Sequence, residues 1–184
     1  MRSIYAVAVL AVLFAATAAA YSMWSQTLSI NANIETGKVS VSFGDYMCTD
    51  TGADPQMNKV FDNSNGEDVG TCQISVAATD SENNVVKLNF DISNAYPGYL
   101  ACIKFNVMNT GTIPVKLYSY KLEGVNETAL NVTFTPPEQT QINPGEASDT
   151  YTLCVGIYPS ADEDRSYSFT LELTFAQWNQ VSGP

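Results

Sequence analysis

Residues 26–43 read Gln-Thr-Leu-Ser-Ile-Asn-Ala-Asn-Ile-Glu-Thr-Gly-Lys-Val-Ser-Val-Ser-Phe, and this stretch decides how the rest of the chain is interpreted. Its first half has the period of two that is expected of a strand with one buried face. The apolar positions are Leu28, Ile30, Ala32 and Ile34. After Thr36-Gly37 the phase reverses, because Val39 and Val41 are now the apolar members. The glycine therefore predicts a hinge or bulge between two separate strands.

A hydrophobic segment precedes this stretch. Residues 4–16 are apolar and uncharged, Arg2 is the one charge before them, and the alanines at 18–20 fit a cleavage site. We expect residues 1–20 to be a secretory signal peptide, residues 21–36 to be an N-terminal strand with its hinge, and residues 37–184 to be one domain. The alternative for the first segment is a retained membrane anchor, for which its length is at the short limit.

The composition limits the chemistry that is available. The chain has 184 residues, a net charge of −11 and no histidine. The acidity argues against a nucleic acid partner, because phosphate neutralisation needs a basic patch. Without imidazole, Ser-His-Asp and Cys-His mechanisms, blue-copper sites and histidine-zinc sites are excluded. A pair of carboxylates would still permit glycoside hydrolysis, but no motif selects such a pair. We therefore expect no catalytic residue, no enzyme activity and no small-molecule substrate.

Four cysteines in a chain with a secretion signal indicate disulfides, and three pairings are possible on paper. Cys48 and Cys72 bracket one long polar loop, whereas Cys102 and Cys154 both lie in apolar strand patterns. We predict disulfides Cys48–Cys72 and Cys102–Cys154, the first of which ties an insertion at residues 45–71. Free buried thiols are the alternative. A CxxC spacing, which would suggest a zinc or redox site, does not occur.

Short strand-like runs with turn residues between them continue to the end of the chain. Turn signals such as Tyr96-Pro97-Gly98 and Asn143-Pro144-Gly145 separate them. This punctuation predicts an all-β sandwich with a jelly-roll-like or immunoglobulin-like path, from which the N-terminal strand protrudes. The predicted strands lie near residues 26–34, 38–44, 72–79, 84–92, 100–109, 114–123, 130–135, 150–158 and 165–175.

Two kinds of modification or ligand site are candidates. Asn126 and Asn131 begin N-x-T sequons, which accept N-linked glycans when they are exposed. Asp62, Ser64 and Asp68 place oxygen atoms around a glycine and are candidate calcium ligands, although the full EF-hand spacing is not met. The alternatives are chance sequons and an ordinary solvated loop. No other cofactor is expected.

Several motifs taken together resemble the TasA and camelysin-like family of secreted filament proteins, and among them the archaeal bundling pilins. The resemblance implies a jelly-roll-like subunit of an extracellular, biofilm-associated filament that assembles by donor-strand complementation. Camelysin-type relatives are sometimes called metalloproteases, but this chain has no histidine and no HExxH motif, so that activity is not carried over. The motifs are Trp24–Leu28, Glu35–Val39, Tyr96–Gly98, Asn109–Val115, Asn143–Glu146, Tyr167–Thr170 and Gln177–Asn179.

Such an assembly also has a physical basis in the residues. A sandwich that lacks one strand exposes apolar side chains and unpaired backbone groups until a strand from elsewhere fills the gap. The predicted donor strand comprises Trp24, Leu28, Ile30, Ala32 and Ile34, with Thr36 and Gly37 as its hinge. The expected partners are other copies of the chain and neighbouring filaments in bundles at the cell surface. Two alternatives stay open: residues 24–34 form the domain's own first strand, or the protein is a monomeric adhesin or binding module.

Overall fold

The computed structural model describes residues 2–20, 26–58 and 61–181, which divide into a first compact unit, residues 1–35, and a second, residues 36–184. The first unit contains helix α1 (Arg2–Ala20). Among the described residues, no helix has the length and apolar character needed to cross a membrane.

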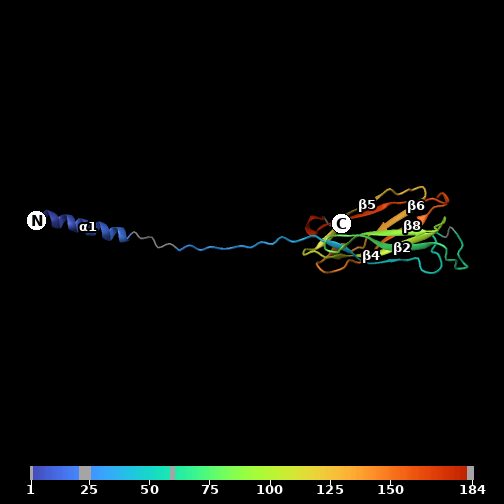
Figure 1. Ribbon diagram of the computed structural model, residues 1–184, viewed down its shortest axis with the longest axis horizontal. Helices are drawn as coiled ribbons and strands as arrows, with labels where there is room; N and C mark the ends of the chain where they lie inside the picture. The colour runs from blue at the N-terminus through green and yellow to red at the C-terminus, as the bar shows by residue number, and fades with distance from the viewer. Residues whose placement is uncertain (1, 21–25, 59–60, 182–184) are drawn as a thin grey trace. The chain divides into compact units, whose positions relative to one another are not determined.

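Residues 26–40 form no strand (Figure 1), so the strand predicted at 26–34 is wrong for the single chain. Alternation alone does not make a strand, because the backbone groups of a strand need a hydrogen-bonded neighbour. The alternative was that residues 24–34 form the domain's own first strand. Their described part, residues 26–34, forms no strand in the domain. Trp24 lies outside the described residues.

The first layer of the second unit is a four-stranded antiparallel sheet in the order β1-β4-β8-β6. Its strands are β1 (Val41–Cys48), β4 (Leu100–Asn109), β8 (Tyr151–Ile157) and β6 (Leu130–Thr135). Along β4, Ala101, Ile103, Phe105 and Val107 are buried while the residues between them are more exposed. This alternation gives the sheet one apolar face.

Two smaller antiparallel sheets pack against that face. One contains β2 (Thr71–Thr79) and β3 (Val85–Ser93), and the other contains β7 (Gln141–Ile142), β5 (Val115–Glu123) and β9 (Thr170–Gln177), followed by the short helix η1 (Trp178–Gln180). Side chains from both sheets contact one core that includes Phe105 and Leu153. The prediction of an all-β sandwich is therefore confirmed at this level. Eight of the nine predicted strands overlap observed ones, although β9 begins five residues later than predicted, and the short β7 was missed.

The first core strand begins later than predicted and contains an irregularity. β1 starts at Val41 rather than at residue 38, and its register shifts between Phe43 and Tyr46. The Asn106 side chain stabilises this bulge by accepting a hydrogen bond from the Asp45 amide at 2.9 Å. β1 thus contains a bulge of its own, and the hinge predicted at residues 36–37 lies before this strand.

Both predicted disulfides are present, Cys48–Cys72 and Cys102–Cys154. The second joins directly paired residues of β4 and β8. Two intramolecular disulfides indicate that the chain folds in an oxidising, non-cytoplasmic environment.

One end of the sandwich, called here the linker end, is where the chain enters the second unit. The Asn84 side chain, just before β3, donates a hydrogen bond to Ser40 Oγ at 3.2 Å, so β3 begins beside residues 36–40. The Trp178 amide, just after β9, donates to the Pro114 carbonyl at 3.1 Å. β3 therefore begins at the linker end and β9 finishes there.

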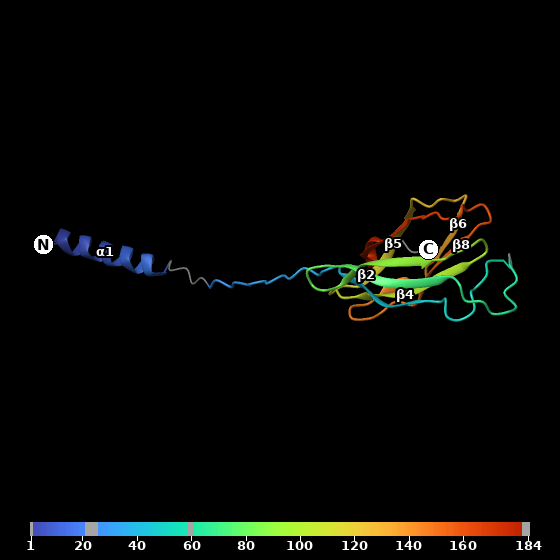
Figure 2. The same ribbon diagram turned by 45° about the vertical axis from the view of Figure 1, so that its right-hand side comes forward.

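The opposite end, called here the loop end, carries the insertion 49–70, drawn in cyan away from residues 36–40 in Figures 1 and 2. The insertion reaches Tyr99 through a bridge from Gln56. Ile92, at the end of β3, and Phe169, just before β9, both pack against the core cluster that contains Tyr99. The two strands consequently run in opposite directions between the same two ends.

Candidate functional site

A long groove of about 1000 Å³ lies between β3 and β9. Its walls are these two strands, and its floor includes Ile103, Phe105 and Val107 of β4. Within the described residues β3 pairs only with β2 and β9 pairs only with β5. Each wall therefore presents an unpaired row of backbone N–H and C=O groups toward the groove.

Apolar side chains from both walls line the groove, and no strand lies between the walls to cover them. Leu88 and Phe90 on β3, and Leu171, Leu173 and Phe175 on β9, are only partly buried although they contact the main core. Open strand edges of this kind pair with other chains, and native proteins normally cover them. The groove is thus the place where two strand edges of the sandwich stay open in the described chain.

The apolar residues of segment 26–35, called here the arm, are exposed. Leu28, Ile30 and Ile34 retain 88%, 94% and 83% of their surface. Ala32, the fourth apolar position, is exposed as well. Single exposed leucines are common, but an alternating row of them is not.

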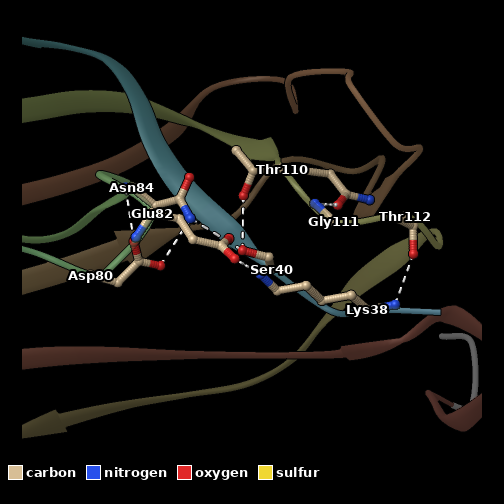
Figure 3. Close-up of polar contacts among 9 residues, drawn as sticks. Lys38, Ser40, Asp80, Glu82, Asn84, Thr110, Gly111 and Thr112 are labelled. Carbon is tan, nitrogen blue, oxygen red and sulfur yellow. Dashed lines mark hydrogen bonds and ion pairs between the residues drawn. The ribbon is translucent and has the colours of Figure 1, made fainter. Parts of the chain in front are cut away.

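Residues 38–40, which follow the arm, are held to residues 110–112 of the same unit by hydrogen bonds, and this contact is called here the clamp. Figure 3 shows its side-chain contacts. The Lys38 amide donates to Thr112 Oγ1 at 2.8 Å, and the Thr112 amide donates to the Lys38 carbonyl at 2.9 Å. The Ser40 carbonyl accepts from the amides of Thr110 and Gly111 at 3.0 and 3.1 Å. These four bonds fix the point at which the arm leaves the domain.

The turn before β3 supports the clamp from the other side (Figure 3). Asn84 is buried, and its side-chain amide donates to Ser40 Oγ and to Asp80 Oδ2, the latter at 2.9 Å. The hydrogen bond from Asn84 holds the pKa of Asp80 below its usual value. Lys38 Nζ forms an ion pair with Glu82. The start of β3, one wall of the groove, is therefore bonded directly to residues 38–40.

Two glycines permit this close packing. A Cβ atom on Gly111 would lie 2.3 Å from the Lys38 carbonyl oxygen, and one on Gly37 would lie 2.2 Å from Cγ2 of Ile113. The predicted hinge at Thr36 and Gly37 thus lies where the chain leaves the arm and comes into tight contact with the domain.

A second polar cluster organises the insertion 49–70. Asp54 is buried, and its carboxylate accepts hydrogen bonds from the amides of Val69 and Gly70 at 3.1 Å and from the Tyr96 hydroxyl at 2.7 Å. Burial alone would raise the pKa of Asp54, but these hydrogen bonds outweigh it and hold the pKa below its usual value. Burial and the bond to Asp54 raise the pKa of Tyr96 to about 12. The cluster has a structural explanation and needs no ligand.

Acid should destabilise the protein through Asp54. A carboxyl group whose pKa is lower in the folded state stabilises the fold above its unfolded pKa, about 3.9, and this contribution is lost as the pH falls through the folded value. We expect Asp54→Asn to lower the free energy of unfolding by about 1.5–3 kcal/mol at pH 7. Thermal unfolding between pH 7 and pH 2 should show a smaller acid effect in the variant; equal acid dependence in both proteins would contradict this role.

The structure separates the other predicted site residues. Asn126 is exposed, and its Oδ1 accepts hydrogen bonds from the backbone amide and the hydroxyl of Thr128. Asn131 lies in β6, and its side-chain amide donates to Met57 Sδ at 3.6 Å. Only Asn126 is presented as an accessible acceptor.

The calcium candidates form a hydrogen-bonded turn. Asp62 Oδ1 accepts from the Ser64 amide at 2.9 Å, and Asp68 is exposed. In the described part of the chain no group of three or more carboxylate, cysteine or histidine side chains is arranged to hold a metal.

Sequence reasoning identified the arm and predicted a gap for a missing strand, but it did not predict which strands border the groove, and it did not predict the clamp. The Asn109-Thr110-Gly111 turn was recognisable, but its contact with residues 38–40 joins positions about seventy apart in the chain, which no local pattern reveals. Comparison of the chain with protein-family models, with curated proteins and with solved structures found no match.

Proposed function

We propose that this protein is the structural subunit of an extracellular filament in which the arm of one copy fills the groove of the next. On this proposal the finished subunit is a jelly-roll-like sandwich completed by a donor strand, and its role is assembly rather than catalysis. The observation that carries the proposal is the combination of an apolar groove with two unpaired edges and an exposed arm whose apolar residues alternate.

The dimensions of the two parts agree. The walls β3 and β9 have 9 and 8 residues. The alternating positions of the arm run from Leu28 to Ile34, which is a similar length of extended chain. A strand in this groove would pair on both sides and would join the two small sheets into one.

The energy available is sufficient for a stable contact. Burial of Leu28, Ile30 and Ile34 contributes roughly 1.5–3 kcal/mol each. Main-chain hydrogen bonds to both walls add to this, as in other complexes formed by strand addition. Ordering the arm offsets part of the gain.

The geometry of such a contact favours a fibre. Donor and acceptor are different surfaces of one subunit, so the contact is heterologous and does not close on itself unless a rotation returns it to the start. Each subunit then has one neighbour at each end. We propose further that neighbouring filaments associate side by side into bundles at the cell surface.

Deletion of residues 21–34 tests the proposal. The variant should be secreted as a folded monomer and form no fibres, because the groove remains but no donor is present. The matched control replaces residues 21–34 with a Gly/Ser segment of equal length, which keeps the spacer and removes only the apolar face. Negative-stain microscopy and sedimentation of secreted material are the measurements. Normal fibres from either variant would refute the donor-strand proposal, and monomers from the intact chain would favour the adhesin alternative.

A further inference from the structure

We infer that the arm enters the groove in one direction only, parallel to β3 and antiparallel to β9, and that it leaves the groove at the loop end of the acceptor. The inference rests on the proposed function and specifies the partner surface: the linker end of the donor docks against the loop end of a second copy of this chain.

The two walls of the groove run in opposite directions. β3 runs from the linker end to the loop end, because Asn84 at its start contacts Ser40 and Ile92 near its finish packs with Tyr99. β9 runs the other way, from Phe169 at the loop end to its finish at the linker end. An inserted strand is therefore parallel to one wall and antiparallel to the other, and only two arrangements exist.

The segment that joins the arm to the body of the donor is short. The clamp begins at Lys38, so only residues 35–37 join the last apolar position of the arm, Ile34, to the body of the donor. The four extended steps from the Cα atom of Ile34 to that of Lys38 span about 14 Å. The body of the donor consequently lies directly at the end of the acceptor's groove from which its arm emerges.

Only one of the two arrangements allows the assembly to grow. If the arm emerged at the acceptor's linker end, the linker ends of both copies would lie side by side. Each arm would then be within reach of the other copy's groove, and the two chains would exchange arms in a closed, isologous dimer that cannot grow. If the arm emerges at the loop end, the acceptor's own arm remains free at its other end, and growth continues.

Strand direction also distinguishes assembly between copies from insertion of the arm into its own groove. An arm folded back into its own groove would enter from the linker end with its C-terminal residues there, and would run antiparallel to β3. The direction of the strand thus distinguishes the open fibre from the closed dimer and from the self-filled monomer.

Intermolecular disulfides can read this direction. On β3, Lys87 lies toward the linker end and Asp91 toward the loop end, and both are exposed. Their Cα atoms are separated by about 13 Å along the strand, whereas a disulfide requires Cα atoms within about 7 Å. On the polar face of the arm, Ser29 and Asn33 have the same spacing.

The experiment coexpresses two full-length variants, one with an arm cysteine and one with a groove cysteine, and examines purified fibres on non-reducing gels. We expect dimers from S29C with K87C and from N33C with D91C, at about tenfold the yield of the crossed pairs. Each variant expressed alone is the control for adventitious disulfides.

The outcomes test the strand direction and the groove separately. Dimers from the crossed pairs, S29C with D91C or N33C with K87C, would overturn the direction while leaving the donor strand in place. Fibres that give no dimer from any pair would overturn the groove as the acceptor, and with it the proposed function. Reconstruction of the wild-type fibre by electron microscopy reads the same strand direction without any substitution.

Discussion

Replacing Ile30 with aspartate should abolish fibre formation while leaving the domain folded. Ile30 is 94% exposed in the single chain, so the substitution removes no contact of the folded subunit. In the proposed filament the new carboxylate would replace an apolar side chain in the groove, whose lining includes Ile103, Phe105 and Val107. The lost burial of about 1.5–3 kcal/mol and the cost of an unpaired buried charge, several kcal/mol more, act together. At 1.4 kcal/mol for each factor of ten, we expect subunit affinity to fall at least ~1000-fold.

The matched control for this prediction is Asn31→Asp, which adds the same charge to the opposite face of the arm. We expect assembly to weaken by less than about tenfold, because that side chain stays in solvent and surface charges contribute little. Fibre yield by sedimentation, with thermal unfolding of the soluble fraction as the test of folding, compares the two variants. Equal loss in both would contradict the assignment of the arm's faces, and normal fibres from Ile30→Asp would contradict its insertion into an apolar groove.

The sandwich could be predicted from sequence because its strands satisfy their pattern within the chain. In β4, Ile103, Phe105 and Val107 alternate with polar neighbours, and the layer they face is formed by residues of the same domain. The disulfides followed from the same reasoning, since Cys102 and Cys154 lay in two apolar runs that pair directly. Where local pattern and tertiary partner agree, the sequence is sufficient.

The arm could not be predicted as a structure, only as a pattern. Its alternation equals that of β4, but residues 26–34 form no strand in the single chain. The position of the groove could not be predicted for a related reason. The sequences of β3 and β9 do not indicate that one edge of each strand stays unpaired. Asp54 was also missed, because its donors Val69, Gly70 and Tyr96 are distant in sequence. Disagreement between local pattern and observed structure thus marks the proposed assembly site.

Moving the arm to the other end of the chain should convert the subunit into a stable monomer. The variant lacks residues 21–34 and carries a copy of residues 26–35 after Val181, joined by about four Gly/Ser residues, a length typical of hairpin loops. β9 finishes at the linker end, so the appended strand returns along β9 in an antiparallel direction, which is the direction inferred for the fibre. Burial of the copied Leu28, Ile30 and Ile34 contributes roughly 4–9 kcal/mol before ordering costs.

We expect the melting temperature of this monomer to exceed that of the arm-deleted domain by about 10 °C or more, since a domain of this size gains about 2–4 °C per kcal/mol. The control is the same variant with aspartate at the copied Ile30 position, which should melt like the arm-deleted domain. A strand of opposite direction would have to start at the loop end, and four linker residues reach at most ~14 Å, about half the length of β3. Stabilisation therefore requires both an acceptor groove and the inferred direction, and unchanged melting in the moved-arm variant would contradict them together.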